Sequence, residues 1–275
     1  MKDERGMKDE RHAARSEGQA RMQSEARMQS EARMQSQSQA QALLSVRGLH
    51  AHYGKSHILR GVDFEVGHGQ VLSLLGRNGS GRSTTLKALM GLVPPSAGQV
   101  LFDGAELAGL PPYAIARRGM AYVPEEREVF ANLSVEENLI MGMQAAREGI
   151  ARWSVERMFD YFPRLKERRN TLAGNLSGGE QQMLTICRSL LGNPRLIMID
   201  EPTEGLAPKI VEVVGEAIQD IHRHGVSVIL VEQKLTIAMR ISTDVCLLGH
   251  GHVVFSGTPA ELTERPQLLK DWLAV

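Results

Sequence analysis

The stretch "LLGRNGSGRSTT", residues 74–85, decides the fold. It begins within the apolar run "VLSLL", residues 71–75, and leads into a helix-forming segment, so its glycines lie between a buried strand and a helix. Glycines let the backbone curl so that its N–H groups face an anion, and a helix N-terminus adds positive potential. The pattern G-x-x-x-x-G-K-[ST] of phosphate-binding loops fits at Gly76, Gly81 and Ser83. Arg82 occupies its lysine position.

This loop predicts a site for the phosphates of ATP together with Mg²⁺. Its expected contacts are Gly76, Arg77, Asn78, Gly79, Ser80, Gly81, Arg82, Ser83 and Thr84. The hydroxyl of Ser83 suits Mg²⁺, with Thr84 assisting. The alternative is a glycine-rich turn that binds nothing. Arg82 keeps the charge of lysine on a wider, planar head, so we expect the loop to bind Mg-ATP but to hydrolyse it slowly, because phosphoryl transfer depends on positioning.

The stretch "RLIMIDE", residues 195–201, predicts the other half of the site. Its apolar residues form a buried strand, and Asp200 and Glu201 emerge at the carboxyl end of that strand. Ligands of open α/β sheets bind at this edge. Asp200 is placed to hold Mg²⁺ through water, and Glu201 is placed to polarise an attacking water molecule. The alternative is a buried strand with a solvated acidic end.

The rest of the chain predicts one α/β domain behind a polar N-terminal segment. Residues 1–42 contain short repeats such as "RMQSEA" and too few large apolar residues to offset the entropy of ordering. We expect a disordered low-complexity tail, or an artefact of the start site. Over residues 43–275, buried strands alternate with helices, which indicates an α/β sheet. A helical stretch at about 126–192 interrupts the alternation and predicts an inserted helical subdomain.

Local patterns also place individual elements. Short strands are expected over 43–49 and 58–66, and a helix is expected to begin in the loop and end near residue 91. Ser134 and Glu137 have the spacing of a capping box, which predicts a helix start. The segment "TDVCLLGHGHVVFSG" predicts a β-hairpin with "GHG" at its tip.

Composition excludes several classes of function. Lys and Arg total 32, as do Asp and Glu, so no nucleic acid partner is expected, because phosphate backbones attract clustered positive charge. The two cysteines, Cys187 and Cys246, lack metal-ligand spacing. No apolar run approaches the roughly 18 residues needed to span a bilayer. If the protein serves a membrane, we expect it to do so as a peripheral subunit.

The most specific stretch is "NLSGGEQQ", residues 175–182. Ser177, Gly178 and Gly179 at a helix N-terminus form another anion cradle, with Glu180 in the first turn. The string resembles the signature motif of ABC-type ATPases, and the resemblance covers roughly residues 43–260. It implies a mixed β-sheet core, an antiparallel β subdomain and an inserted helical subdomain. It also implies that this cradle grips the γ-phosphate of ATP held by a second subunit.

Other positions follow the pattern of that family. Tyr53 matches the aromatic residue that stacks on adenine; the alternative is a core tyrosine. Glu125 stands where many relatives have a glutamine that senses Mg²⁺ and contacts the permease, so we place it among the metal and nucleotide contacts. Gln233 stands where most relatives have a histidine that reads the γ-phosphate. The resemblance therefore implies catalytic roles for Glu201 and Gln233.

The segments "YVPE", "PTEGLAP" and "VEQ" resemble one branch of the family. This branch is the second ATPase subunit of branched-chain amino-acid importers, with urea and amide importers close by. The resemblance implies a peripheral protein at the cytoplasmic face of the membrane, which works with permease subunits, a second ATPase subunit and, indirectly, an extracytoplasmic solute-binding protein. We expect the surface from Glu125 to Phe130 to dock the permease.

Two other functions remain open at this point. One is a soluble ABC ATPase in translation or DNA repair, although such proteins usually carry two cassettes or long coiled coils. The other is a mainly ATP-binding regulatory subunit of the same importer. In a heteromer, Arg82 would weaken one site, while the other would combine the partner's loop with the intact "LSGGEQ" of this chain. The transported solute is determined by other chains.

Overall fold

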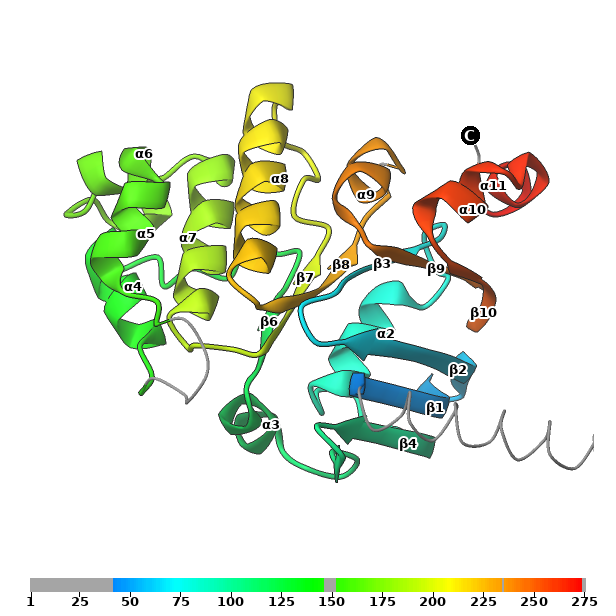
Figure 1. The fold of residues 1–275 in the computed structure, drawn as a ribbon. Helices are drawn as coiled ribbons and strands as arrows, with labels where there is room; N and C mark the ends of the chain where they lie inside the picture. Colours follow the sequence, from blue (N-terminus) through cyan, green and yellow to red (C-terminus); the bar gives the residue numbers. More distant parts are fainter. Residues whose placement is uncertain (1–41, 146–151, 234, 274–275) are drawn as a thin grey trace, which may run out of the picture. The chain divides into compact units, whose positions relative to one another are not determined.

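The computed structural model describes residues 42–145, 152–233 and 235–273 (Figure 1). The tail expected over residues 1–42 therefore lies outside the described residues, apart from Ala42, which opens the first strand. The fold is built on two sheets, and helices cover the larger one.

The larger sheet has six strands in the order β10-β9-β3-β8-β7-β6. They are β3 (Val71–Leu75), β6 (Met120–Val123), β7 (Leu196–Asp200), β8 (Ser227–Val231), β9 (Asp244–Gly249) and β10 (His252–Gly257). Strands β6, β7, β8, β3 and β9 run parallel, and the expected hairpin adds β10 antiparallel to β9. Every residue of β3, β7 and β8 is buried, as in a parallel sheet covered on both faces.

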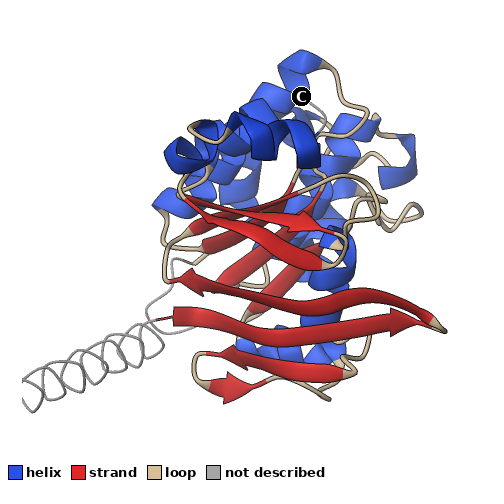
Figure 2. Ribbon diagram, turned by 90° about the vertical axis from the view of Figure 1, so that its right-hand side faces the viewer, coloured by secondary structure: helices blue, strands red, loops and turns tan. Residues whose placement is uncertain are grey.

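The smaller sheet has four strands in the order β2-β1-β4-β5 and forms a second layer beside the larger sheet (Figure 2). They are β1 (Ala42–Tyr53), β2 (Ser56–Gly67), β4 (Ala97–Phe102) and β5 (Ala105–Glu106). The antiparallel β subdomain implied by the resemblance is thus present. Strands β1 and β2 are longer than predicted, because the extended backbone continues to a tight turn at Gly54, whose φ is 56°.

The helix that follows the glycine loop is α2 (Arg82–Leu89). Its Leu86 and Leu89 belong to a core that also contains Leu44 from the small sheet and Ile229 from the large sheet. Helix α2 is therefore packed between the two sheets, which fixes the position of the loop at its N-terminus. The helix α3 (Pro112–Arg118) precedes β6.

The opposite face of the large sheet carries most of the other helices (Figure 1). The region 126–192 contains α4 (Val135–Gly142), α5 (Val155–Tyr161), α6 (Pro163–Glu167), a 3₁₀ turn (Ala173–Asn175) and α7 (Gly178–Leu190). The remaining helices are α8 (Pro208–Arg223), α9 (Leu235–Ile241), α10 (Pro259–Thr263) and α11 (Pro266–Leu273). The capping box predicted at Ser134 and Glu137 is present at the start of α4.

The side chains of strand β7 contribute to two hydrophobic cores, one on each face of the large sheet. Ile197 and Ile199 face the helical side, whereas Leu196 and Met198 face α2 and the small sheet.

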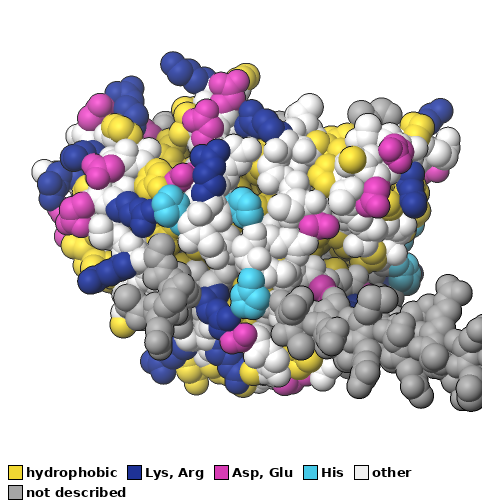
Figure 3. Space-filling view, viewed as in Figure 1, with side chains coloured by type: hydrophobic (Ala, Val, Ile, Leu, Met, Phe, Trp, Pro, Cys, Tyr) yellow, Lys and Arg dark blue, Asp and Glu magenta, His cyan; other side chains and the backbone are white. Residues whose placement is uncertain are grey.

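On the face in Figure 3, acidic and basic side chains mix over the helical region. Within the described residues, no helix is both long and apolar enough to cross a membrane.

Candidate functional site

The glycine loop between β3 and α2 adopts a backbone that only glycine accommodates at two positions. Gly76 has a φ of 148°, and a Cβ there would lie 2.5 Å from the backbone oxygen of Leu248. Gly81 has a φ of 106°, and a Cβ there would lie 2.8 Å from the side chain of Leu59. These close approaches explain why the sequence has glycine at both positions.

The N-terminus of α2 suits an anion. The first N–H groups of a helix have no acceptor within the helix. Gly81, the N-cap, provides no capping side chain, and the first turn contains no acidic residue. The buried hydroxyl of Ser80 in the same loop has no hydrogen-bond partner within the described chain. The N–H groups at the start of α2 therefore suit a phosphate group, whereas the Ser80 hydroxyl does not line the cavity described below.

Arg82 does not extend into solvent. Its side chain is only 4% exposed. Nη1 donates to the backbone oxygen of Glu232 at 3.0 Å. Nη2 donates to Oδ1 of Asn78 at 3.1 Å and to Oε1 of Glu201 at 2.8 Å. The guanidinium thus joins the glycine loop to the residues that follow β7 and β8.

Glu201 lies at the carboxyl end of β7, as predicted, with an unusual backbone. Its φ of 44° is in the left-handed region, which costs energy for a non-glycine residue and is frequent at functional sites. Its carboxylate accepts from Arg82 and, through Oε2, from Nε2 of Gln233 at 2.7 Å. Burial and the neighbouring carboxyl of Glu204 raise the pKa of Glu201 to about 7, against the opposing effects of Arg82 and Gln233.

Asp200 lies beside the loop through its own hydrogen bonds. Oγ of Ser83 donates to Oδ1 of Asp200 at 3.0 Å, and Oη of Tyr122 donates to Oδ2 at 3.2 Å. Burial raises the pKa of Asp200. A serine hydroxyl next to a carboxylate supplies the hard oxygen ligands that Mg²⁺ prefers, so these residues fit the predicted ion.

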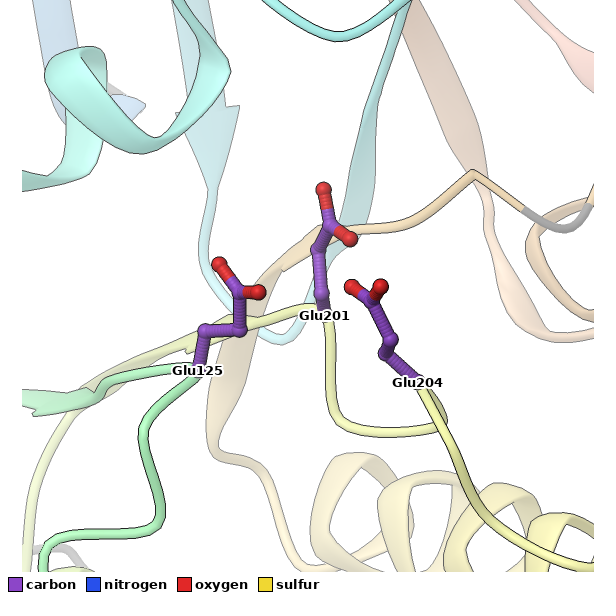
Figure 4. Close-up of side chains that lie close together, drawn as sticks. All are labelled: Glu125, Glu201 and Glu204. Atoms are coloured by element: carbon purple, nitrogen blue, oxygen red, sulfur yellow. The ribbon is translucent and has the colours of Figure 1, made fainter.

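Tyr122 and Glu204 are site residues that the sequence did not reveal. Tyr122 reaches Asp200 because β6 pairs in parallel with β7, opposite Met198. Glu204 lies on the turn after β7, and one oxygen from each of Glu125, Glu201 and Glu204 lies within 4.8 Å of the others (Figure 4). Burial and the nearby Glu204 and Asp200 carboxylates raise the pKa of Glu125.

A cavity of about 320 Å³ lies among several of these groups, although Asp200 and Tyr122 do not line it. Its lining residues are Ile58, Asn78, Gly79, Gly81, Arg82, Ser83, Thr84, Glu125, Glu201, Glu204 and Gln233. The structure thus brings together the loop, the end of β7, Glu125 and Gln233, as the sequence predicts. Gly76, Arg77 and Ser80 lie in the same loop without lining the cavity.

The remaining predicted residues lie elsewhere in the chain. Tyr53 ends β1, is 49% exposed and does not line the cavity. Ser177 caps α7, where its hydroxyl and the Glu180 carboxylate form a capping box. Gly178 abuts the Arg127 guanidinium so closely that a Cβ would collide with it. The stretch 177–180 is therefore not part of the loop's own cavity.

A strand, a glycine loop and a helix, facing two acidic residues at the end of a parallel strand, define a nucleotide-binding α/β protein. A family model described as ABC transporter matches residues 59–204. The chain belongs to the ATP-binding proteins of ABC transporters, which confirms the resemblance and the fold class inferred from the sequence.

Named relatives are similar over nearly their whole length. The chain is 40% identical to the high-affinity branched-chain amino acid transport ATP-binding protein BraG of Pseudomonas aeruginosa, covering 84% of this chain and 99% of that protein. It is 38% identical to the probable branched-chain amino acid transport ATP-binding protein LivF of Archaeoglobus fulgidus, covering 81% and 94%. A solved ATP-binding subunit of an ABC transporter is 31% identical, with a TM-score of 0.71 over 82% of this chain and 94% of that one.

Proposed function

We propose that the protein is an ATP-hydrolysing subunit of an importer for branched-chain amino acids. The observation that carries this proposal is the single cavity in which the glycine loop, Ser83, Glu201 and Gln233 face one another. The names of BraG and LivF supply the solute class. The likeness covers 84% of this chain for BraG and 81% for LivF.

Each residue of the site has a proposed role. The loop amides and Arg82 bind the β- and γ-phosphates of ATP. Ser83 and Asp200 hold Mg²⁺, with Glu125 nearby; the ion, when bound, neutralises charge on the phosphates. Glu201 orients the attacking water and accepts its proton. Gln233 positions Glu201 through the hydrogen bond to Oε2.

The rest of the nucleotide contacts involve Tyr53 and a second chain. Tyr53 is exposed at the end of β1, where it is free to stack on adenine. Ser177, Gly178, Gly179 and Glu180 do not line the loop's cavity. This separation supports their proposed role at the nucleotide of a second ATPase subunit. BraF, another Pseudomonas aeruginosa transport ATP-binding protein, is 30% identical to this chain and indicates the kind of partner.

The proposed location is the cytoplasmic face of the membrane, where the subunit binds permease subunits. The segment from Glu125 to Phe130 is the proposed docking surface, and the Phe130 side chain is 48% exposed. An extracytoplasmic solute-binding protein would deliver the amino acid to the permease. The proposed domain division places residues 1–42 outside the ATPase domain of residues 43–275, with its helical subdomain at about 126–192.

The test is transport by the complete complex in proteoliposomes. We expect leucine, isoleucine or valine uptake to require ATP on the side of this subunit and to increase its hydrolysis. The Glu201→Gln variant of this chain, assembled with the same partners, separates its own contribution from theirs. Absence of fluorescent nucleotide binding by the purified chain would overturn the proposal. Stimulation of hydrolysis by RNA or DNA, without membrane association, would instead favour the translation or repair function.

A further inference from the structure

The ion pair between Arg82 and Glu201 connects the two halves of the site directly. We propose that Arg82 locks Glu201 in a resting ion pair, which a nucleotide must break before Glu201 can act on water. This inference rests on the proposed ATPase function and assigns to residue 82 a role that a phosphate-binding lysine would not have. Arg82 acts on hydrolysis here as a positioning residue.

The hydrogen bonds of the Arg82 guanidinium hold Glu201 in this ion pair. Both of its terminal nitrogens are engaged, one with the Glu232 backbone oxygen and the other with Asn78 and Glu201. These acceptors come from the end of β8, the glycine loop and the end of β7. A lysine ammonium is a single nitrogen on a flexible stem, whereas the planar fork of arginine spans separate acceptors. The substitution at position 82 therefore creates a bridge that the usual residue would not hold in the same way.

Burial strengthens the bridge. The Arg82 and Glu201 side chains are 4% and 8% exposed, and their atoms lie 2.8 Å apart. Removing one partner of a buried ion pair leaves an uncompensated charge, so the pair is costly to separate unless another anion replaces the carboxylate. A phosphate group is such an anion, because arginine binds phosphate and carboxylate with the same fork. The nucleotide and Glu201 consequently compete for Arg82.

The resting pair also fixes the carboxylate that is proposed to act on water. Oε1 of Glu201 accepts from Arg82, and Oε2 accepts from Gln233. Each oxygen has a second lone pair that can still accept from water, but the ion pair with Arg82 fixes the direction in which the carboxylate points. The loop of this chain thus binds nucleotide against a competitor and hydrolyses it slowly. In a heteromer, the faster site is the one that combines the partner's loop with Ser177 of this chain.

The test measures affinity for a fluorescent ADP analogue with Mg²⁺, using the purified full chain, so that no turnover is involved. Glu201→Gln should tighten ADP binding about tenfold, because Arg82 no longer has a charged competitor. Glu204→Gln is the matched control. It removes a negative charge from the same cavity, but Glu204 is not among the acceptors of Arg82. We expect this control to tighten binding clearly less than Glu201→Gln does, because it reduces charge repulsion toward the phosphates but removes no acceptor of Arg82.

Two further measurements distinguish the ion pair from a general effect of charge in the cavity. In an Arg82→Lys background, the effect of Glu201→Gln should fall to the level of the Glu204→Gln control, because the ammonium does not span the same acceptors. Arginine side-chain NMR should show Arg82 Nη signals that are protected from exchange. Glu201→Gln should weaken this protection at Nη2, while Nη1 stays bonded to Glu232. If Glu201→Gln and Glu204→Gln tightened ADP binding equally, the proposed resting ion pair would be overturned, while the proposed function would stand. If no variant bound the analogue, the proposed function itself would fail.

Discussion

At position 82, a guanidinium reaches groups that an ammonium would not bridge. Its hydrogen bonds join residues that lie 119 and 150 positions away in the sequence, which is why the motif reveals the substitution but not its consequence. The same applies to Tyr122 and Glu204. They lie in the segments "YVPE" and "PTEGLAP", but nothing in those strings assigns either side chain to the site. Both reach it because strand pairing and the turn after β7 bring them there.

Arg82→Lys should increase steady-state ATP turnover of the purified chain roughly tenfold to a hundredfold, because the base is released and the cation returns to the position used in phosphoryl transfer. A phosphate-release assay measures the rate, with Glu201→Gln as the blank. The prediction is wrong if the unchanged protein already turns over well above that blank and lysine adds nothing.

Tyr122→Phe should raise the Mg²⁺ concentration needed for half-maximal binding of the ADP analogue about tenfold. The lost hydroxyl donates to Asp200, and outer-sphere hydrogen bonds of this kind orient metal ligands. A Mg²⁺ titration of analogue fluorescence measures the change. Tyr113→Phe, at an exposed tyrosine outside the site, is the control and should leave the titration unaltered.

At the scale of elements, the sequence predicts what local chemistry determines. The capping box of α4, the hairpin of β9 and β10, and the strand before the glycine loop follow from residues close together in the chain. The lengths of β1 and β2 were underestimated, since the sequence did not show that the extended backbone continues to Gly54 on both sides of the turn. The grouping of α4 to α7 on one face depends on tertiary packing.

Two helices with the same cap allow a matched comparison. Ser134 begins α4 and Ser177 begins α7, each with a capping box. Ser134→Ala and Ser177→Ala should each lower the free energy of unfolding by about 1 kcal/mol. Denaturation followed by circular dichroism measures this loss.

Only the Ser177 variant should also slow ATP turnover in the assembled complex, because its hydroxyl is proposed to face the partner's nucleotide. The complex is therefore assayed with each variant in turn at a temperature where both remain folded. Equal activities of the two complexes would show that Ser177 is a helix cap without a role at the nucleotide.

At the scale of the whole molecule, each cysteine reports on a different core. Cys187 lies in the core that packs the helices on the large sheet, and Cys246 lies in the core between the two sheets. Burial raises the pKa of both thiols, that of Cys246 to about 12. Both should react with a thiol reagent at least about a hundredfold more slowly in native buffer than in denaturant, as protected thiols do.

Mass spectrometry of the labelled peptides identifies which thiol reacts first. Cys187→Ser and Cys246→Ser serve as single-thiol controls, provided that each keeps the native melting transition. Rapid labelling of either cysteine in native buffer would contradict the prediction, since its core would then open without global unfolding.

The central position of β3 governs when the site is completed during synthesis. Its two neighbours, β8 and β9, both come much later in the chain, and the N–H of Gly69 before β3 bonds to Ser227 of β8 across 158 positions. A ribosome adding about 5–20 residues per second needs roughly ten to thirty seconds to make that interval. Throughout this time, "VLSLL" is an apolar segment without either partner strand. The nucleotide loop is therefore completed only when most of the chain has emerged, and a nascent chain halted before β8 would be a substrate for chaperones.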